Sequence, residues 1–186
     1  MQALNLSLFQ WMAAGQSPNA QILWIASLTA QYASWLCALL VAWTAWRHPA
    51  QRTYVLGVLV AAAVASVLAH LLAKAIHLPR PFVVGLSPSY IEHGARGSLP
   101  SAHATVMFTV ALICCLRPAI RRVGIVLFLI ALVTGWARIY VGVHFPLDVL
   151  AGFVLAAGMT AVFRLIWRLV ARGGANDAHA PGAGAG

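Results

Sequence analysis

The sequence predicts an all-α membrane protein: a bundle of about five transmembrane helices preceded by a short interfacial helix. Of its 186 residues, 62% are hydrophobic and only 8% are charged, and the mean hydropathy is +0.86. Soluble domains carry roughly 25% charged residues, so this chain lies well outside their range. The apolar residues also gather in runs close to the ~20 residues that a helix needs to cross a bilayer. These runs leave no room for a separate soluble domain.

Five apolar runs are the predicted spans, and each must be helical because lipid offers no hydrogen bonds to the backbone. They cover residues 20–46, 53–76, 101–116, 119–137 and 147–171. The segment from Leu4 to Gly15 is too short to cross and lacks basic residues, so we expect an interfacial helix anchored by Phe9 and Trp11. Residues 173–186 are rich in Gly and Ala and are predicted to form a disordered tail.

The net charge of +9 arises from twelve basic and three acidic residues. The basic residues are scattered between apolar runs and do not line one polar face, which argues against a nucleic-acid partner. Cytoplasmic loops carry an excess of Lys and Arg. Eight arginines fall on one predicted side: Arg47, Arg52, Arg117, Arg121, Arg122, Arg164, Arg168 and Arg172. We therefore expect the segments 77–100 and 138–146 to lie outside the cytoplasm.

Three segments on the predicted outer side hold nearly all the reactive side chains: KAIHLPRPF (from Lys74), GSLPSAH (from Gly97) and RIYVGVHFPLD (from Arg138). They supply cations for a polyanion, two histidines that can attack or transfer a proton, and a carboxylate. Phosphoryl transfer needs these three kinds of group. In addition, Pro100 and Pro146 lie at predicted helix starts, with Ser101 close to a cap position, so two helix amino ends can face an anion.

Together the three segments resemble the signature of the PAP2 (type 2 phosphatidic acid phosphatase) superfamily of membrane lipid phosphatases. The family pattern is Lys, six residues, Arg-Pro; then Pro-Ser-Gly-His; then Ser-Arg, five residues, His, three residues, Asp. The third segment fits with the right spacings from Arg138 through His144 to Asp148. The second fits over residues 100–103, with Ala102 in the place of glycine.

The sequence departs from the family pattern at two places. Only five residues separate Lys74 from Arg80, and Ala137 replaces the serine before Arg138. The resemblance implies that residues 1–172 form the phosphatase domain.

A narrower resemblance covers most of the chain. The stretches LNLSLF, RPFVVGLSPSYIEHGARGSLPSAH and ARIYVGVHFPLDVLAG are similar to undecaprenyl-diphosphate phosphatases of the bacitracin-resistance type, a bacterial branch of the superfamily. This resemblance implies an enzyme of the bacterial cytoplasmic membrane that recycles the carrier lipid for cell-wall synthesis. It would dephosphorylate the C55 lipid diphosphate on the periplasmic side, which agrees with the orientation expected from the arginines.

The resemblance also implies a role for each site residue. His144 attacks the terminal phosphorus and forms a phosphohistidine, Asp148 orients its ring, and His103 protonates the leaving lipid phosphate. The phosphoryl oxygens are held by Lys74, Arg80, Ser101 and Arg138. No metal or cofactor is implied, because the whole chain has only three carboxylate side chains, too few for a two-magnesium site.

Other interpretations stay open. The signature residues bind the phosphate and do not select the lipid tail, so phosphatidylglycerol phosphate, phosphatidate or lipid A are alternative substrates. The shortened first segment is compatible with a non-catalytic lipid-binding protein. The remaining histidines are predicted to be interface anchors, although His77 and His93 are close enough in sequence to line the pocket. Arg96 is expected to contact either substrate phosphate or lipid headgroups.

Overall fold

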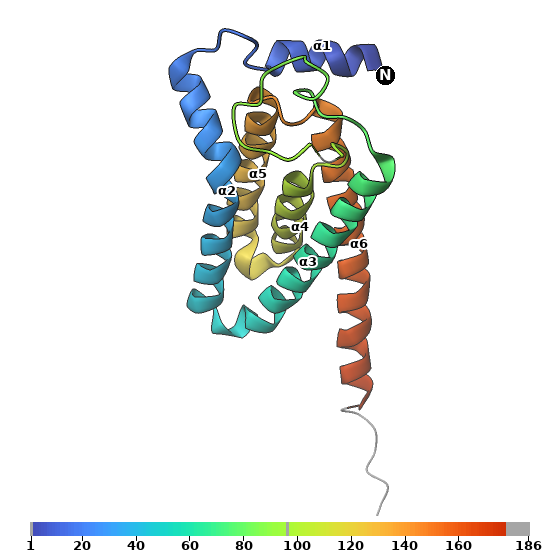
Figure 1. Cartoon of the computed structure of the whole chain (residues 1–186). Helices are drawn as coiled ribbons and strands as arrows, with labels where there is room; N and C mark the ends of the chain where they lie inside the picture. Colours follow the sequence, from blue (N-terminus) through green and yellow to red (C-terminus); the bar gives the residue numbers. More distant parts are fainter. Residues whose placement is uncertain (1, 96, 178–186) are drawn as a thin grey trace, which may run out of the picture.

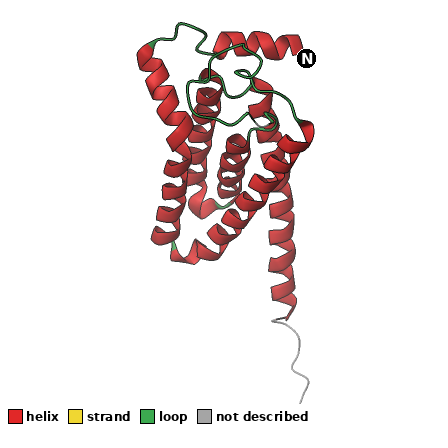
Figure 2. Ribbon diagram, in the orientation of Figure 1, coloured by secondary structure: helices red, strands yellow, loops and turns green. Residues whose placement is uncertain are grey.

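The computed structural model describes residues 2–95 and 97–177, and these residues form helices and loops without strands (Figure 2). The helices are α1 (Gln2–Met12), α2 (Ala20–Arg47), α3 (Arg52–Ile76), α4 (Ala102–Leu116), α5 (Arg121–Tyr140) and α6 (Pro146–Asp177). Short 3-10 turns, Pro49–Gln51 and Pro118–Ile120, lead into α3 and α5. The predicted all-α class is confirmed.

Helix α4 lies at the centre of the bundle, where α3, α5 and α6 pack around it (Figure 1). Most of its side chains from Ala104 to Cys114 are buried. A helix that is apolar on all sides is expected in such a position. Its 15 residues span about 22 Å, which is less than the ~30 Å hydrocarbon core of a bilayer. The outer helices therefore provide the full-length spans.

Four stretches are long and apolar enough to cross a membrane: Ala20–Arg47, Pro49–Ile76, Pro118–Tyr140 and Pro146–Ala171. Their outer faces expose large apolar side chains, among them Trp24, Trp35, Leu56, Leu71, Val154 and Leu165. Apolar surface on this scale is matched to acyl chains and not to water. The protein is an integral membrane protein, as predicted.

The C-terminal helix differs from the prediction. The tail was predicted to begin at residue 173, but α6 continues to Asp177 and extends beyond the other helices (Figure 1). Glycine costs only about 1 kcal/mol in a helix, so Gly173 and Gly174 do not end it, and the next proline is Pro181. The remainder of the predicted tail, residues 178–186, lies outside the described residues.

Helix α1 lies across one end of the bundle (Figure 1). Phe9 is 1% exposed and its ring packs on Phe145, with the centroids 5.2 Å apart. The Asn5 side chain accepts a hydrogen bond of 3.1 Å from the Leu147 N–H at the start of α6. The expectation that Phe9 anchors the helix in the interface is wrong, because its ring fills a gap in the protein. Trp11 is 83% exposed, as an anchor would be.

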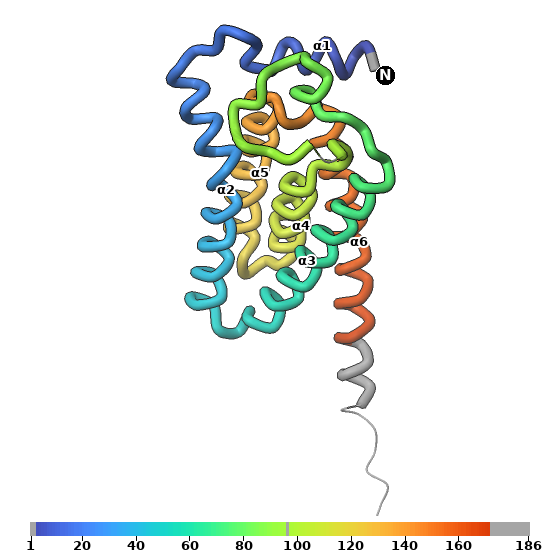
Figure 3. The backbone as a smooth tube through the Cα atoms, viewed as in Figure 1, coloured from blue at the N-terminus to red at the C-terminus, as the bar shows by residue number. Residues whose placement is uncertain are grey.

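The α3–α4 loop (residues 77–95 and 97–101) covers the same end as α1 (Figure 3). Two glycines allow it to pack closely. A Cβ on Gly97 would collide with the carbonyl oxygen of Ala73, and one on Gly142 would collide with that of Pro88. Gly142 also has a positive φ of 80°, a backbone conformation that residues other than glycine rarely adopt. These contacts bring the loop against the end of α3 and the junction between α5 and α6.

Candidate active site

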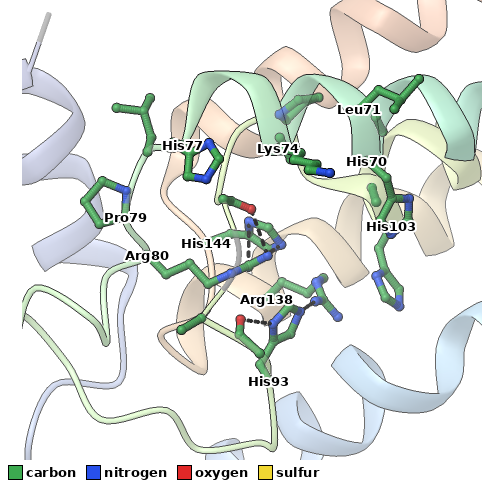
Figure 4. Close-up of a pocket in the computed structure, with 18 of the residues that line it drawn as sticks. His70, Leu71, Lys74, His77, Pro79, Arg80, His93, His103, Arg138 and His144 are labelled. Atoms are coloured by element: carbon green, nitrogen blue, oxygen red, sulfur yellow. Dashed lines mark hydrogen bonds between the residues drawn. The ribbon is translucent and has the colours of Figure 1, made fainter.

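A cavity of about 1260 Å³ opens at the end of the bundle that the α3–α4 loop covers (Figure 4). It is lined by five of the seven side chains predicted for the site: Lys74, Arg80, His103, Arg138 and His144. These residues come from three segments that are far apart in the chain. The fold therefore gathers the cations and both histidines around one space.

His144 lies just before α6 and is 2% exposed. Its Nδ1 is 3.3 Å from Oδ2 of Asp148, and its Nε2 is 3.2 Å from Nη1 of Arg80. Nη1 of Arg80 is also 3.5 Å from Nδ1, so Nε2 is the nearer of the two ring nitrogens. A guanidinium group can only donate hydrogen bonds, so these contacts, together with the carboxylate beside Nδ1, favour the tautomer with the proton on Nδ1 and a lone pair on Nε2.

Asp148 is 3% exposed and stands behind His144, in the first turn of α6. Its Oδ2 also accepts hydrogen bonds from the Ser98 hydroxyl and from the Phe145 N–H, the latter at 2.7 Å. These donors hold the carboxylate in place, and the carboxylate in turn orients the imidazole. Its position suits an orienting group, because the described cavity lining includes His144 but not Asp148.

Two of the three predicted cations of the site are buried guanidinium groups. Arg80 is 6% exposed and donates to the carbonyl oxygens of Val143 (2.9 Å) and Gly97 (3.1 Å). Arg138 is 2% exposed, donates to the carbonyl oxygen of Ala30 at 3.0 Å, and has an Nε without a partner among the described residues. Rigid forks of this kind match the geometry of phosphate oxygens.

The other two cavity-lining site residues come from helix ends. His103 belongs to the first turn of α4, and Lys74 belongs to the last turn of α3. Figure 4 shows both side chains around the same space as His144. The shortened first segment therefore still places Lys74 in the cavity.

Burial and neighbouring charges shift the pKa values of His144 and Arg80. The pKa of His144 lies well below its usual value because of burial and, next, the charges of Arg138 and Arg80. Burial also lowers the pKa of Arg80, an effect that Asp148 opposes. His144 is therefore neutral at neutral pH, which a nucleophile requires.

Ser101 occupies the N-cap position of α4, but its side chain makes no cap hydrogen bond. It is fully buried, its N–H donates to the Asp148 carbonyl at 2.9 Å, and its hydroxyl has no partner among the described residues. It is not one of the residues that line the cavity. Pro146 is the first residue of α6, as expected, whereas Pro100 precedes the α4 cap. A phosphate contact from Ser101 stays a prediction.

Sequence reasoning missed Ser98 and undervalued His93. Ser98 is fully buried and bonds to Asp148; it lies in the second segment, but outside residues 100–103, which fit the family pattern. His93 lines the cavity, as does His77, so the pocket alternative applies to both. Both of the missed contacts depend on how the α3–α4 loop folds, which spacing does not reveal. Arg96 lies outside the described residues.

The sequence comparisons decide the family. Residues 54–172 match the profile of the PAP2 superfamily. The chain belongs to this superfamily. It is therefore a membrane phosphatase, in agreement with the interpretation of the three segments.

Two relatives and one solved structure illustrate the assignment. The chain is 34% identical over 174 residues to a protein of Escherichia coli (strain K12) named "Putative undecaprenyl-diphosphatase YbjG"; the match covers 90% of this chain and 85% of that protein. It is 40% identical over 78 residues to the undecaprenyl-diphosphatase BcrC of Bacillus subtilis (strain 168), covering 42% of this chain and 39% of BcrC. The structure of a transmembrane PAP2 type phosphatidylglycerolphosphate phosphatase from Bacillus subtilis superposes with a TM-score of 0.69 at 22% identity, covering 91% of this chain and 87% of that one. This superposition shows a shared fold.

Proposed function

We propose that the protein hydrolyses undecaprenyl diphosphate to undecaprenyl phosphate and inorganic phosphate. The observation that carries this proposal is the position of His144, whose Nε2 lies beside the buried Arg80 guanidinium and whose ring lines the same cavity as Arg138 and a second histidine, His103. The names of YbjG and BcrC support the choice of substrate. The enzyme would lie in the bacterial cytoplasmic membrane with its site facing the periplasm, and residues 1–172 would form the catalytic domain.

In the first step, Nε2 of His144 attacks the terminal phosphorus while the bond to the bridging oxygen breaks. We propose that His103 is protonated once the anionic diphosphate is bound, because the anion offsets the positive charges around the cavity. It gives this proton to that oxygen, so undecaprenyl phosphate leaves and a phosphohistidine remains. The Asp148 carboxylate stabilises the imidazolium charge that develops on His144. Substrate phosphate replaces Nε2 as the acceptor for Arg80, which frees the nucleophile.

In the second step, His103 takes a proton from water as the water attacks the phosphohistidine. The bond between phosphorus and Nε2 breaks, inorganic phosphate leaves, and both histidines return to their starting states. Arg80, Arg138 and Lys74 hold the equatorial oxygens throughout. Preorganised donors of this kind contribute about 100-fold to 1000-fold each to turnover.

The wall of the cavity formed by α3 favours a lipid-linked phosphate over a soluble one. Ser66, His70 and Lys74 recur every four residues, so they share one face of α3 and extend for about 12 Å along it. Val67 and Leu71 line the cavity beside them and are each 58% exposed. Because α3 belongs to a membrane-spanning stretch, a substrate can place its phosphates at Lys74 and its apolar chain along Val67 and Leu71.

Phosphate release from a series of lipids tests the proposal. Purified protein in detergent is given undecaprenyl diphosphate, phosphatidylglycerol phosphate, phosphatidate or lipid A, with His144→Ala as the matched control. We expect the fastest release from undecaprenyl diphosphate. Faster release from another lipid would assign the protein to that substrate, and no release at any pH from 5 to 9 would favour a non-catalytic lipid-binding protein.

The same assay in excess EDTA tests the metal-independent mechanism. The cations of the site are guanidinium and ammonium groups, which already neutralise phosphoryl oxygens. We expect activity to persist. Loss of activity in EDTA that magnesium restores would contradict the mechanism.

A further inference from the structure

His93 reaches the cavity from the α3–α4 loop and lies outside all three signature segments. Its ring makes a T-shaped contact with the ring of His144, with the centroids 5.9 Å apart and the planes at 79°. Its Nε2 lies 2.7 Å from Nη2 of Arg138, and its Nδ1 lies 3.1 Å from the carbonyl oxygen of Gly94. One half-buried side chain thus touches two of the residues that carry the proposed chemistry.

The hydrogen bonds of His93 require a neutral ring. Nη2 of Arg138 can only donate, so Nε2 of His93 accepts, and Nδ1–H donates to the Gly94 carbonyl. The charged groups that face the ring agree with this state. Burial and then Arg80 lower the pKa of His93 to about 4, with a smaller contribution from Arg138. At neutral pH the lone pair on Nε2 is therefore present.

This lone pair completes the support of the Arg138 guanidinium. Nη1 donates to the carbonyl oxygen of Ala30 at 3.0 Å and Nη2 donates to His93, so two acceptors from different parts of the chain fix the plane of the fork. Nε has no partner among the described residues, although Arg138 is only 2% exposed. A buried donor without a partner is costly, and an oxyanion in the cavity would satisfy it.

We propose that His93 is a positioning residue that holds Arg138 in the orientation in which its remaining N–H groups meet the phosphoryl oxygens of the transition state. The inference rests on the proposed phosphoryl transfer but not on the identity of the lipid tail. In the ground state Arg80 and Lys74 still bind phosphate, so loss of His93 would affect turnover more than substrate binding. A misplacement of about 1 Å in such a site can cost on the order of 100-fold in rate.

Three variants test the role by steady-state kinetics. His93→Leu removes the acceptor, and we expect kcat to fall about 10-fold to 100-fold while KM changes less than about threefold, the pattern of an interaction made in the transition state. His93→Gln keeps an acceptor near the Nε2 position and should restore most of kcat. His48→Leu, at an exposed histidine on the opposite end of the bundle, is the matched control and should behave as wild type.

A double-mutant cycle distinguishes positioning of Arg138 from general damage to the fold. If His93 acts through Arg138, His93→Leu should have little further effect in the Arg138→Ala background. An equal loss in both backgrounds, unchanged kcat in His93→Leu, or failure of His93→Gln to recover activity would each overturn the proposal.

Binding of orthovanadate, measured by calorimetry, separates this inference from the proposed function because it needs no turnover. Mimics of the phosphoryl transition state bind through the groups that stabilise it. We expect vanadate to bind His93→Leu about 10-fold to 100-fold more weakly than wild type, with recovery in His93→Gln. Equal affinity would contradict the role of His93, whereas normal vanadate binding without phosphate release from any lipid would contradict the proposed function alone.

Discussion

Arginines lie at both ends of the helical bundle, but the two ends use them differently. At the end that carries the cavity, Arg80 and Arg138 are 6% and 2% exposed, and their guanidinium groups donate to backbone carbonyls inside the protein. At the opposite end the arginines of the helix connections are mostly exposed: Arg47, Arg52, Arg121 and Arg122. Burying a cation in a membrane protein is costly, and such residues usually serve a ligand.

The arginines at the opposite end have structural partners. Arg52 donates to the Ala45 carbonyl at 3.1 Å near the end of α2. Arg117 donates to Gln51 at 2.7 Å and lies over the Tyr54 ring, 5.3 Å from its centroid. Such contacts stabilise helix ends and leave charge at the surface. Burial therefore distinguishes the two arginines of the candidate site from the arginines at the opposite end, whereas Lys74, the third cation of the site, is exposed.

Replacing a histidine at each end should give the largest difference in phosphate release. His144→Ala removes the proposed nucleophile and should abolish phosphate release to the background of the assay. His48→Ala, at the opposite end, should leave release unchanged. Equal activity of wild type and His144→Ala would contradict the assignment of the site, and steady-state phosphate release measures both.

The arginines should differ in the same way but by less. Arg80→Ala and Arg138→Ala each remove a preorganised donor, so kcat/KM should fall about 100-fold to 1000-fold, while Arg121→Ala should match wild type. Lys74→Ala should cost less than either, because an ammonium group on a flexible stem does not hold two oxygens at once. A loss in Arg121→Ala as large as in Arg138→Ala would remove the distinction between the ends.

The pH profile should report the positive charge of the cavity end. Because the pKa of His144 is lowered by burial, Arg138 and Arg80, the acidic limb of kcat/KM should lie below the ordinary histidine value of about 6.5. Arg80→Gln removes one of these charges and should move the limb to higher pH. The substrate titrates identically in both assays, so an unchanged limb would contradict this cause of the shift.

Single exposed cysteines test which end of the bundle faces the outside of the membrane. In a background without Cys37, Cys114 and Cys115, Ser89→Cys lies on the α3–α4 loop and Ala50→Cys lies on the connection between α2 and α3; both positions are exposed. An impermeant thiol reagent should label the first and not the second in intact spheroplasts. Labelling at Ala50→Cys alone would reverse the proposed orientation.

Much of the fold could be predicted because apolar runs in a membrane chain leave few alternatives to helices. The predicted runs agree with α2 to α6 within a few residues at most ends. The central place of α4 could not be predicted, because its apolar run resembles those that face lipid. Phe9 was misjudged for a similar reason: one aromatic residue on a short helix suits either lipid or a gap beside Phe145.

The candidate site could be predicted where fixed spacings carry the signal, as for His144 and Asp148 four residues later. The contributions of Ser98 and His93 could not, because they depend on the course of the α3–α4 loop. Close packing of Gly97 and Gly142 against distant backbone sets that course. Spacing within one segment contains no information about contacts of this kind.

Rapid-quench trapping of the phosphoenzyme, with substrate labelled in its terminal phosphate, tests whether His144 is the nucleophile. We expect acid-labile, base-stable label on wild-type protein and a smaller amount on His103→Ala, because a positioned proton donor contributes about 100-fold to 10,000-fold to the rate of attack. We expect none on His144→Ala. Label of this kind on His144→Ala would mean that another residue is the nucleophile.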